Sequence, residues 1–366
     1  MSPKVTVLMS VFNGEEFLRE AIASVLIQTF ADFEFIIIDD ASTDGTWETL
    51  SEYASRDQRI VLIQNPKNIG LPRSLNKGLS LARGKYIARQ DADDVSLPER
   101  LERQVDFLDE HPEVILVSSH YQIIGPEGSF LGHSQQAIDP DLVSWYMLFY
   151  NYVAGHSVVM FRRAPVMDLG GYRETTLHAQ DYDLWLGLSK VGEIAILPEL
   201  LMKYRRHDAQ ITVAAREEQE AFALDLVRKT ISELLGEELN REAARELRGF
   251  WIYRFPDTRR IDFLHSKLEE IYQAFLVQRQ KRASFDPNLP SKLRVIVGKQ
   301  FFEWGATLLK TFSLLSTIRV LVYAFRWSPM GALTWCLKAS YRAPVSLLRA
   351  PFIQKQSGEI TSERSS

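Results

Sequence analysis

Short apolar runs alternate with amphipathic segments through the first 110 residues, and this alternation limits the possible folds more than any other feature. The runs are rich in Val, Ile and Phe, as expected of buried strands, and lie at 5–11, 33–39, 59–65 and 85–89. The intervening segments carry apolar residues at helical spacing and lie at 15–28, 41–54 and 70–83. This order predicts an α/β fold, with a Rossmann-like, mostly parallel sheet flanked by helices on both faces.

The rest of the chain divides into a mixed part and a helical part. In the mixed part, strands are expected near 114–120 and 156–161, and helices near 139–150 and 181–190. From about residue 214 the pattern is helical throughout. We therefore predict one domain over 1–213 and a helical C-terminal region over 214–366.

Composition and motifs exclude several classes of protein. A net charge of −4 gives no support for a general nucleic-acid binder. Neither G-x-G-x-x-G after the first strand nor G-x-x-x-x-G-K-[ST] occurs, so dinucleotide and P-loop readings lose their main support. A single cysteine, Cys336, fits a reducing compartment such as the cytoplasm. The first apolar run is too short for a signal peptide, and no stretch reaches the roughly 18 apolar residues of a spanning helix.

The segment ARQDADDVS, residues 88–96, places Asp91, Asp93 and Asp94 within four positions. Like charges this close disfavour ionisation unless positive charge compensates them. Polar residues also follow the strands that end at 11 and 39, and ligands collect at the carboxyl ends of parallel strands. Mg²⁺ and Mn²⁺ prefer oxygen ligands, often one or two carboxylates plus substrate phosphates. We predict a divalent cation held by these aspartates and itself holding a diphosphate.

Two stretches in order, VTVLMSVFNGEEFLREAIASVLIQTFADFEFIIIDDASTDGT and YIARQDADDVSLPERL, resemble family 2 of the inverting nucleotide-sugar glycosyltransferases, which have the GT-A fold. The resemblance covers roughly residues 3–212. It implies a metal-dependent enzyme that moves a hexose-type sugar from a nucleotide-sugar, usually a UDP-sugar. The implied acceptor is a carbohydrate or a lipid-linked saccharide in cell-surface polysaccharide synthesis. One direct displacement would invert the anomeric centre.

The resemblance also implies roles for individual residues. Asp40 matches the aspartate that hydrogen-bonds the base, and Asp93 takes the place of the metal-contacting carboxylate of D-x-D. His207, in the segment YRRH, matches a histidine that approaches the metal or the diphosphate. The implied nucleotide-sugar contacts are Val11, Asn13, Glu15, Asp40, Arg73 and Asp91. The implied metal contacts are Asp91, Asp93 and His207.

A transferase of this kind needs a base that takes the proton of the acceptor hydroxyl. In LHAQDYDLWLGLSKVG, residues 177–192, Asp181 matches that base at the start of an amphipathic helix. The family usually shows Glu-Asp here, so Gln180 is a departure and leaves the acceptor contacts open. Gly187 stands where family members often carry an arginine.

Several of these residues also have a purely structural interpretation. Asn13, Asp40 and Asp181 could each cap a helix. Asp94 is expected to be a turn residue ahead of a helix. The other residues with a structural reading are Glu99 and Asp183 as first-turn carboxylates, His156 and Trp185 as packing residues, and His207.

Residues 292–355 carry ten Lys or Arg and one acidic residue, Glu303, among many apolar residues. An interfacial helix buries one apolar face near lipid headgroups while its Lys and Arg meet anionic lipid. We therefore predict association with an anionic membrane surface, with the enzyme peripheral on the cytoplasmic face. The rival reading is a helical cap packed on the catalytic domain, or a helical partner surface.

Two other functions stay open from the sequence. One is a non-catalytic module that binds a sugar nucleotide or a glycan with the same fold. The other is a sugar-phosphate nucleotidyltransferase, although that would want a Gly-rich basic loop where this chain has FNGEE. The reaction product separates the three, because it would be free UDP, nothing, or pyrophosphate.

Overall fold

The computed structural model describes residues 2–153, 155–176, 178–208, 210, 215–282, 284–310 and 313–341. The chain divides into two compact units. The first consists of Met1–Met147 and Asn151–Leu226, and the second of Leu148–Tyr150 and Val227–Ser366. The domain boundary expected at 213/214 lies outside the described residues.

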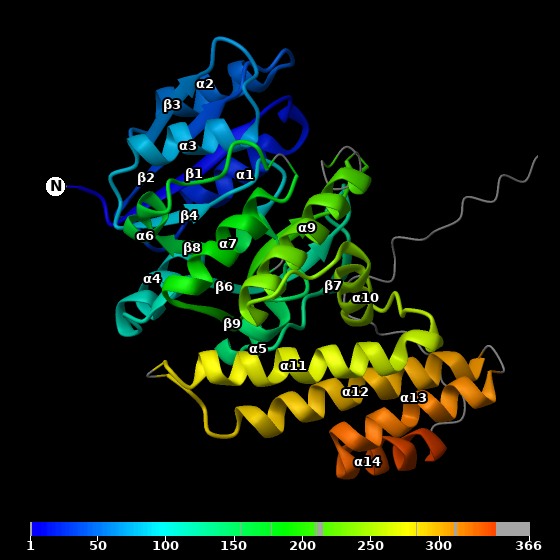
Figure 1. Cartoon of the computed structure of the whole chain (residues 1–366). Helices are drawn as coiled ribbons and strands as arrows, with labels where there is room; N and C mark the ends of the chain where they lie inside the picture. Colours follow the sequence, from blue (N-terminus) through cyan, green and yellow to red (C-terminus); the bar gives the residue numbers. More distant parts are fainter. Residues whose placement is uncertain are drawn as a thin grey trace, which may run out of the picture. The chain divides into compact units, whose positions relative to one another are not determined.

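The first unit is built on one mixed β-sheet (Figure 1). The strands are β1 (Val5–Val11), β2 (Phe33–Asp39), β3 (Ile60–Gln64), β4 (Tyr86–Arg89), β5 (Val95–Ser96), β6 (Val114–Ile124), β7 (Phe130–His133), β8 (Met160–Arg162) and β9 (Glu193–Arg205). Among the described residues their order is β3-β2-β1-β4-β8-β6-β9-β5, with β7 paired to β6. Pairing is parallel through β3-β2-β1-β4 and between β6 and β9, and antiparallel elsewhere. The predicted α/β fold class is confirmed.

Helices cover both faces of the parallel part, which explains why β1 and β2 are buried along their whole length. On one face, Leu18 and Ile22 of α1 and Val105 of α4 pack into a core with Val7 of β1. On the other face α3 packs on β1. The helices of this unit are α1 (Glu15–Leu26), α2 (Thr46–Arg56), α3 (Leu71–Leu81), α4 (Arg100–Glu110), α5 (Pro140–Met147), η1 (His156–Val158), α6 (Arg163–Asp168) and α7 (Gln180–Val191).

The strand expected over 156–161 is wrong in its first half. Residues His156–Val158 form a short 3₁₀ helix, and the strand β8 begins only at Met160. Side chains hold this turn out of the sheet, because Ser157 Oγ donates to Asp94 Oδ2 and His156 Nε2 hydrogen-bonds the Tyr172 hydroxyl at 2.8 Å. The apolar run VVMF therefore marks a buried segment and not a continuous strand.

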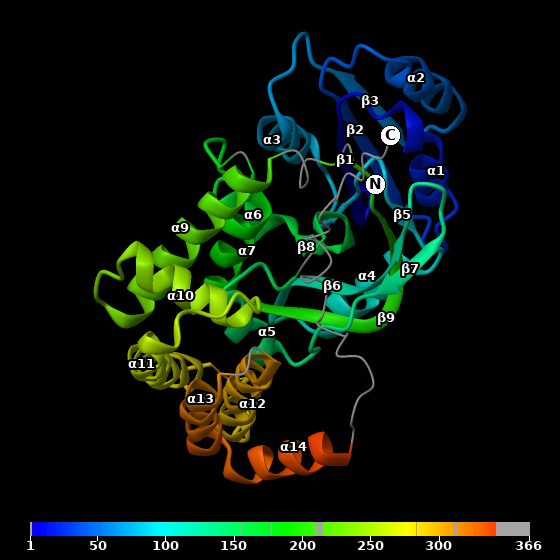
Figure 2. The same ribbon diagram turned by 90° about the vertical axis from the view of Figure 1, so that its right-hand side faces the viewer.

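The second unit is helical, and Figure 2 views α11, α12 and α13 almost along their axes. Its helices are α9 (Arg216–Leu235, shared with the first unit), α10 (Arg241–Trp251), η2 (Thr258–Arg260), α11 (Ile261–Arg279), α12 (Leu289–Lys310), α13 (Leu314–Trp327) and α14 (Pro329–Tyr341). Aromatic rings fill its core: Phe250 lies 4.8 Å from Phe301, and Phe255 stacks on Trp304 at 5.7 Å between ring centroids. In the part of the chain that the structure describes, no helix combines the length and apolarity needed to cross a bilayer.

The turn before β4 provides a test of how the sheet is packed. A Cβ on Gly84 would lie 2.4 Å from the backbone nitrogen of Thr6, and backbone cannot rotate away as a side chain can. Because this turn positions the strand that precedes Asp91, we expect Gly84→Ala to lower the unfolding free energy by about 1–3 kcal/mol. Chemical denaturation would measure it. Gly128→Ala is the control for added strain alone, since its φ is +84° but nothing lies within 4 Å of its Cβ position. Equal stability of Gly84→Ala and the wild type would contradict the packing.

Candidate functional site

The loops that follow β1 and β2 are tied together at the carboxyl edge of the sheet. Asn13 Oδ1 accepts a hydrogen bond from the Thr43 backbone at 2.8 Å, and Glu15 Oε2 accepts one from the Gly45 backbone at 2.9 Å. Val11 is buried at the end of β1, where its carbonyl accepts from the Asp40 backbone at 2.8 Å. The structure therefore brings together Val11, Asn13, Glu15 and Asp40, as the sequence predicted from neighbouring parallel strands.

Asp40 is buried, and its carboxylate accepts three hydrogen bonds from within the fold. Its Oδ1 accepts from Asn65 Nδ2 at 2.8 Å and from the Ile69 backbone at 2.9 Å, and its Oδ2 accepts from the Gly70 backbone at 2.8 Å. The carboxylate thereby fixes the loop that leads into α3. A carboxylate offers about four acceptor positions, so one remains for a ligand donor.

The capping interpretation is wrong for Asn13, Asp40 and Asp181. The N-cap positions of α1, α2 and α7 are instead occupied by Gly14, Gly45 and Ala179. The described structure therefore has no side-chain cap hydrogen bond at the start of these three helices. Asn13 has a φ of +52°, which Asn tolerates better than most residues, and Ala41 has a φ of +63°. Left-handed backbone at Ala41 is unfavourable for a residue with a Cβ, so the surrounding hydrogen bonds hold this loop in a strained shape.

Buried arginine side chains compensate the negative charge of the acidic turn, residues 91–94. Arg89, at the end of β4, is fully buried and its Nη2 lies 2.5 Å from Asp91 Oδ1. Burial raises the pKa of Asp91, while the charges of Arg89 and Arg100 lower it. Sequence reasoning missed both arginines. The signal was present for Arg89, since residues two apart on a strand share a face.

Arg100 and Arg205 bind the backbone on either side of the acidic residues. Arg100 Nη2 donates to the carbonyl of Arg89 at 2.7 Å and to that of Val159 at 3.1 Å. Arg205 Nε donates to the Asp93 carbonyl at 2.9 Å, and its guanidinium also pairs with Glu20. Burial lowers the pKa of Arg100 to about 9. Arg205 is not free to bind an anion, because its guanidinium is buried and already bonded.

Asp94 is structural, but it is more than the turn residue that was expected. It is fully buried, and its Oδ1 accepts from the Arg205 backbone at 2.8 Å while Ser157 Oγ donates to its Oδ2. Burial, then the nearby charges of Asp93 and Asp91, raise the pKa of Asp94 well above its ordinary value. Asp94 thereby joins β9 and the turn before β8 to the acidic turn.

Asp93 and His207 meet directly, with His207 Nε2 3.0 Å from Asp93 Oδ2 and both side chains partly exposed. The imidazole also packs on Phe17, whose ring centroid lies 4.8 Å away. In the described part of the chain, no cluster of three or more His, Cys, Asp or Glu is arranged to hold a metal ion unaided. Asp93 and His207 together offer one carboxylate and one imidazole, and Mg²⁺ or Mn²⁺ is often held by one or two carboxylates while substrate phosphates complete the coordination.

Asp181 lies in the first turn of α7 with one hydrogen bond on each oxygen. Asn151 Nδ2 donates to Oδ2 at 2.8 Å, and the Tyr182 backbone donates to Oδ1 at 2.7 Å. Burial raises the pKa of Asp181 to about 6; these hydrogen bonds lower it, and the charge of Asp91 adds to the rise. The effect of Asp91 shows that the start of α7 lies within electrostatic reach of the acidic turn. A carboxyl group with such a pKa can accept a proton near neutral pH.

Aromatic and polar side chains pack beside this carboxyl group. Trp185 is fully buried and lies edge-on to His156, with 5.8 Å between ring centroids, so its packing role is confirmed. His156 hydrogen-bonds Tyr172, and burial followed by the charge of Arg89 lowers the pKa of His156 well below its ordinary value. The imidazole is therefore neutral at physiological pH.

Three other predicted residues lie at the periphery. Arg73, in the first turn of α3, is exposed and pairs with Glu174 at 3.1 Å. Asp183 pairs with Arg173 at 3.2 Å, consistent with its structural reading. Glu99 is exposed and occupies the N-cap position of α4, one residue before the first turn in which it was expected.

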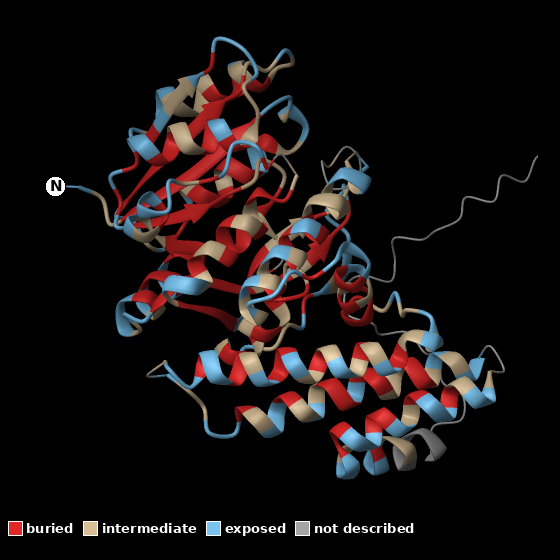
Figure 3. Ribbon diagram, in the orientation of Figure 1, coloured by how far each residue is buried: buried red, intermediate tan, exposed pale blue. Residues whose placement is uncertain are grey.

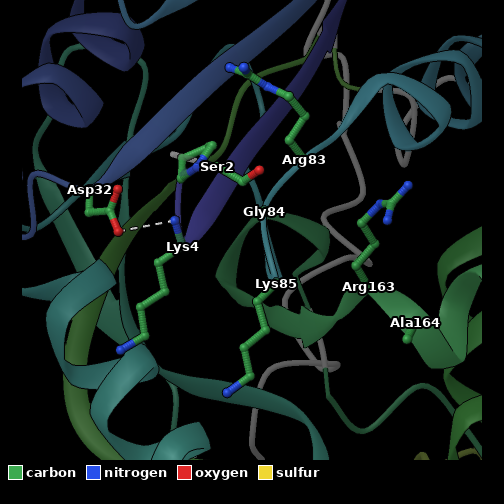
Figure 4. A pocket seen from close by; sticks show the side chains of 9 residues that line it. Ser2, Lys4, Asp32, Arg83, Gly84, Lys85, Arg163 and Ala164 are labelled. Atoms are coloured by element: carbon green, nitrogen blue, oxygen red, sulfur yellow. Dashed lines mark hydrogen bonds between the residues drawn. The ribbon is translucent and has the colours of Figure 1, made fainter.

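A hollow of about 560 Å³ lies at the opposite edge of the sheet, where β1 and β4 begin (Figure 4). Its basic residues are largely paired: Lys4 and Lys85 lie 2.6 and 2.9 Å from the two oxygens of Asp109, and Arg83 lies 2.5 Å from Glu34. We assign no ligand to it, since these cations already have partners.

Comparison with known proteins agrees with this geometry. A family model described as glycosyl transferase family 2 matches residues 6–169. An uncharacterized glycosyltransferase of Haemophilus influenzae is 36% identical over 245 residues, which cover 63% of this chain and 74% of the relative. The amylovoran biosynthesis glycosyltransferase AmsE of Erwinia amylovora is 30% identical over 203 residues, covering 55% of this chain and 75% of the relative.

A solved structure extends the comparison across both units. The crystal structure of S. aureus TarS 1–349 in complex with UDP-GlcNAc matches with a TM-score of 0.54 at 16% identity, covering 92% of each chain. At this identity the likeness is one of fold, and it confirms a GT-A-like sheet followed by a helical C-terminal region. The family predicted from the sequence is confirmed by these matches: the chain belongs to glycosyl transferase family 2 and is a glycosyltransferase.

Proposed function

We propose that this glycosyltransferase moves a hexose-type sugar from a UDP-sugar to a saccharide or lipid-linked saccharide acceptor, with inversion at the anomeric carbon. The observation that carries the proposal is the pairing of two functions in one region. Asp181, a half-buried carboxyl group of raised pKa that Asn151 holds, interacts electrostatically with Asp91 of the acidic turn, where Asp93 contacts His207. A binding module would have no need of a carboxyl group that accepts a proton. A nucleotidyltransferase would need a basic loop where this chain has Glu15 and Glu16.

The class of product follows from the relatives and not from the geometry. AmsE acts in amylovoran biosynthesis by its name, and TarS was crystallised with UDP-GlcNAc. These names support a UDP-sugar donor and a role in cell-surface polysaccharide synthesis for this chain. Among the site residues, Asp40 retains one acceptor position for a donor group on the nucleotide base.

In the proposed reaction, Asp181 accepts the proton of the acceptor hydroxyl as that oxygen attacks the anomeric carbon. The bond from the anomeric carbon to the diphosphate breaks as the new glycosidic bond forms, and the nucleoside diphosphate leaves. The reacting sugar passes through an oxocarbenium-like state, as in glycoside hydrolysis. Asp91, Asp93 and His207 would hold a divalent cation, which when bound neutralises charge on the leaving diphosphate.

The metal assignment is tested by chelation and by one substitution. EDTA should abolish nucleotide release from a panel of nucleotide-sugars, and Mn²⁺ or Mg²⁺ should restore it. Asp93→Asn should lose most activity yet fold normally, because it removes a ligand charge from a partly exposed side chain. Asp106→Asn, an exposed aspartate on α4, is the matched control and should retain full activity. Full turnover in EDTA would refute the metal requirement.

The base assignment is tested at Asp181. Asp181→Asn should still bind donor but lose roughly 10²–10⁴-fold in transfer, the usual contribution of general-base catalysis. The wild-type rate should fall as the pH drops below about 6, because the protonated carboxyl group can no longer accept a proton. Asp183→Asn, in the same helical turn but paired with Arg173, should stay active.

The stereochemistry gives an independent check. A single displacement predicts a product whose anomeric configuration is opposite to that of the donor, which NMR of the product resolves. Retention of configuration, or wild-type turnover by Asp181→Asn, would rule out this mechanism.

A further inference from the structure

The strongest unexplained feature near the site is Asn151, which follows α5 and was not singled out in the sequence. Its Nδ2 donates to Asp181 Oδ2 at 2.8 Å, whereas its Oδ1 is buried and has no hydrogen-bond partner among the residues that the structure describes. A carboxylate accepts but does not donate, so Nδ2 must face Asp181 and Oδ1 must be the free atom. Leaving a buried acceptor unpaired costs about 1–3 kcal/mol, so folding alone does not account for this side chain.

A second unpaired acceptor lies next to Asp181 in the sequence. Gln180 is buried, and in the described part of the chain its Oε1 has no hydrogen-bond partner either. Two free acceptors beside a proton-accepting carboxyl group match a ligand that presents several O–H donors. Saccharides have this chemistry, because each ring carries neighbouring hydroxyl groups.

Resting on the proposed function of Asp181, we propose that Asn151 is a positioning residue: its Nδ2 fixes the carboxylate of Asp181 and its Oδ1 accepts a hydrogen bond from the acceptor saccharide. Donation from Nδ2 favours the ionised carboxylate, so its loss should shift the titration of Asp181 to higher pH. Among the described residues, Asp91 after β4 and Tyr172 after α6 also interact electrostatically with Asp181. Neither is altered by a change at Asn151.

The titration of Asp181 can be followed without substrate, by carboxyl-carbon NMR of the whole chain with Asp181→Asn as the assignment control. We expect a midpoint near pH 6 in the wild type, a higher midpoint in Asn151→Ala, and a still higher one in Asn151→Asp, which adds a second carboxylate. Asn240→Ala is the control for a lost structural hydrogen bond. Asn240 Oδ1 accepts from the Ala243 backbone at 2.8 Å as the N-cap of α10, so its loss should lower stability and leave the midpoint unchanged.

Kinetics complete the test with the donor and acceptor that the nucleotide-release panel identifies. Asn151→Ala should raise KM for the acceptor, leave KM for the donor unchanged, and shift the acid limb of the rate profile upward. An unchanged midpoint and an unchanged acceptor KM would overturn the role of Asn151. If Asp181→Asn were fully active, the proposed function of Asp181 would fail instead, so the two failures are distinguishable.

A separate observation in the second unit concerns the outer face of α13. Its inner face, including Val320, Ala324 and Trp327, is buried. The outer face of α13 is exposed (Figure 3), it carries apolar residues and two arginines, and α13 has no acidic residue. The residues of this outer face are Leu314, Leu315, Ile318, Arg319, Val322, Phe325 and Arg326.

The side chains on this face are exposed, and some of them line a groove. Leu315 is 81% exposed, Ile318 52% and Phe325 40%, and Ile318 and Phe325 line a groove of about 610 Å³. Helices α12 to α14 together carry seven basic residues and one acidic residue. A second copy would place basic charge against basic charge, whereas an anionic lipid surface complements it.

We infer that the outer face of α13 binds an anionic lipid surface, lying in the plane of the headgroups with its apolar side chains inserted. Arg319 and Arg326 flank the apolar residues and both are exposed, one beside Asp262 at 3.4 Å and one over the Tyr323 ring at 4.9 Å. Each would add attraction that weakens as salt rises.

Sedimentation of the whole chain with vesicles tests this, using phosphatidylcholine alone and an equal mixture with phosphatidylglycerol. The wild type should bind the mixture in a salt-sensitive way. Leu315→Ser with Phe325→Ser should weaken binding on the order of a hundredfold. Arg319→Gln and Arg326→Gln should each weaken it about fivefold. Val277→Ser on α11 and Arg245→Gln on α10 are exposed controls in the same unit and should bind as the wild type does.

Several outcomes would overturn the proposal that the outer face of α13 binds an anionic lipid surface. The first is no binding of the wild type to either vesicle, and the second is equal binding by the α13 variants and their controls. The third is a change of oligomeric state in the α13 variants with unaltered lipid binding, which would make this face an interface between copies of the chain. Thermal unfolding of each variant establishes that it is folded.

Discussion

The acidic turn after β4 exists because buried arginines surround it, and the rest of the candidate site is arranged on that turn. Arg89 neutralises Asp91 directly, while Arg100 and Arg205 hold the carbonyls of Arg89 and Asp93. An isolated buried charge is strongly unfavourable, and breaking one partner of a buried pair typically costs about 3–5 kcal/mol. The three arginines come from β4, α4 and β9, so the turn can take this shape only when those elements are packed.

This dependence explains how segments distant in the sequence become one site. Asp94 links the turn to β9 and to the turn before β8, and that turn carries His156 toward Tyr172 and Trp185. On the other side, Ala92 contributes to the core of the parallel sheet, and a Cβ on Gly14 would lie 3.5 Å from its methyl group. The first loop therefore packs against this turn on one side, while on the other a hydrogen bond ties the acidic turn to the turn before β8, whose His156 contacts Trp185 of α7.

The sequence predicted what depends on local pattern and missed what depends on distant partners. The strands of the parallel part were predictable because a strand buried on both faces is a continuous apolar run. The gathering of Asn13, Asp40 and Asp91 was predictable because parallel strands end at one edge. The capping interpretation failed for Asp40 because the loop before α3, 29 residues further along the chain, supplies the backbone donor that its carboxylate accepts from. Arg100 was missed because Arg is mostly exposed and nothing in its local sequence marks it as an exception.

The uneven compensation within the acidic turn bears on where a cation would be needed. Asp91 has Arg89, and Asp94 is buried with two hydrogen bonds and a raised pKa that favours its neutral form. Among the described residues, no arginine side chain pairs with the Asp93 carboxylate, which is only partly buried; its Oδ2 lies 3.0 Å from His207 Nε2 and 3.4 Å from the amide of Gln210. Its carboxylate is thus the one in the turn with the least positive charge supplied by the described protein. A cation shared with a diphosphate would complete the compensation there, which is why the proposed metal is centred on Asp93 and not spread evenly over the turn.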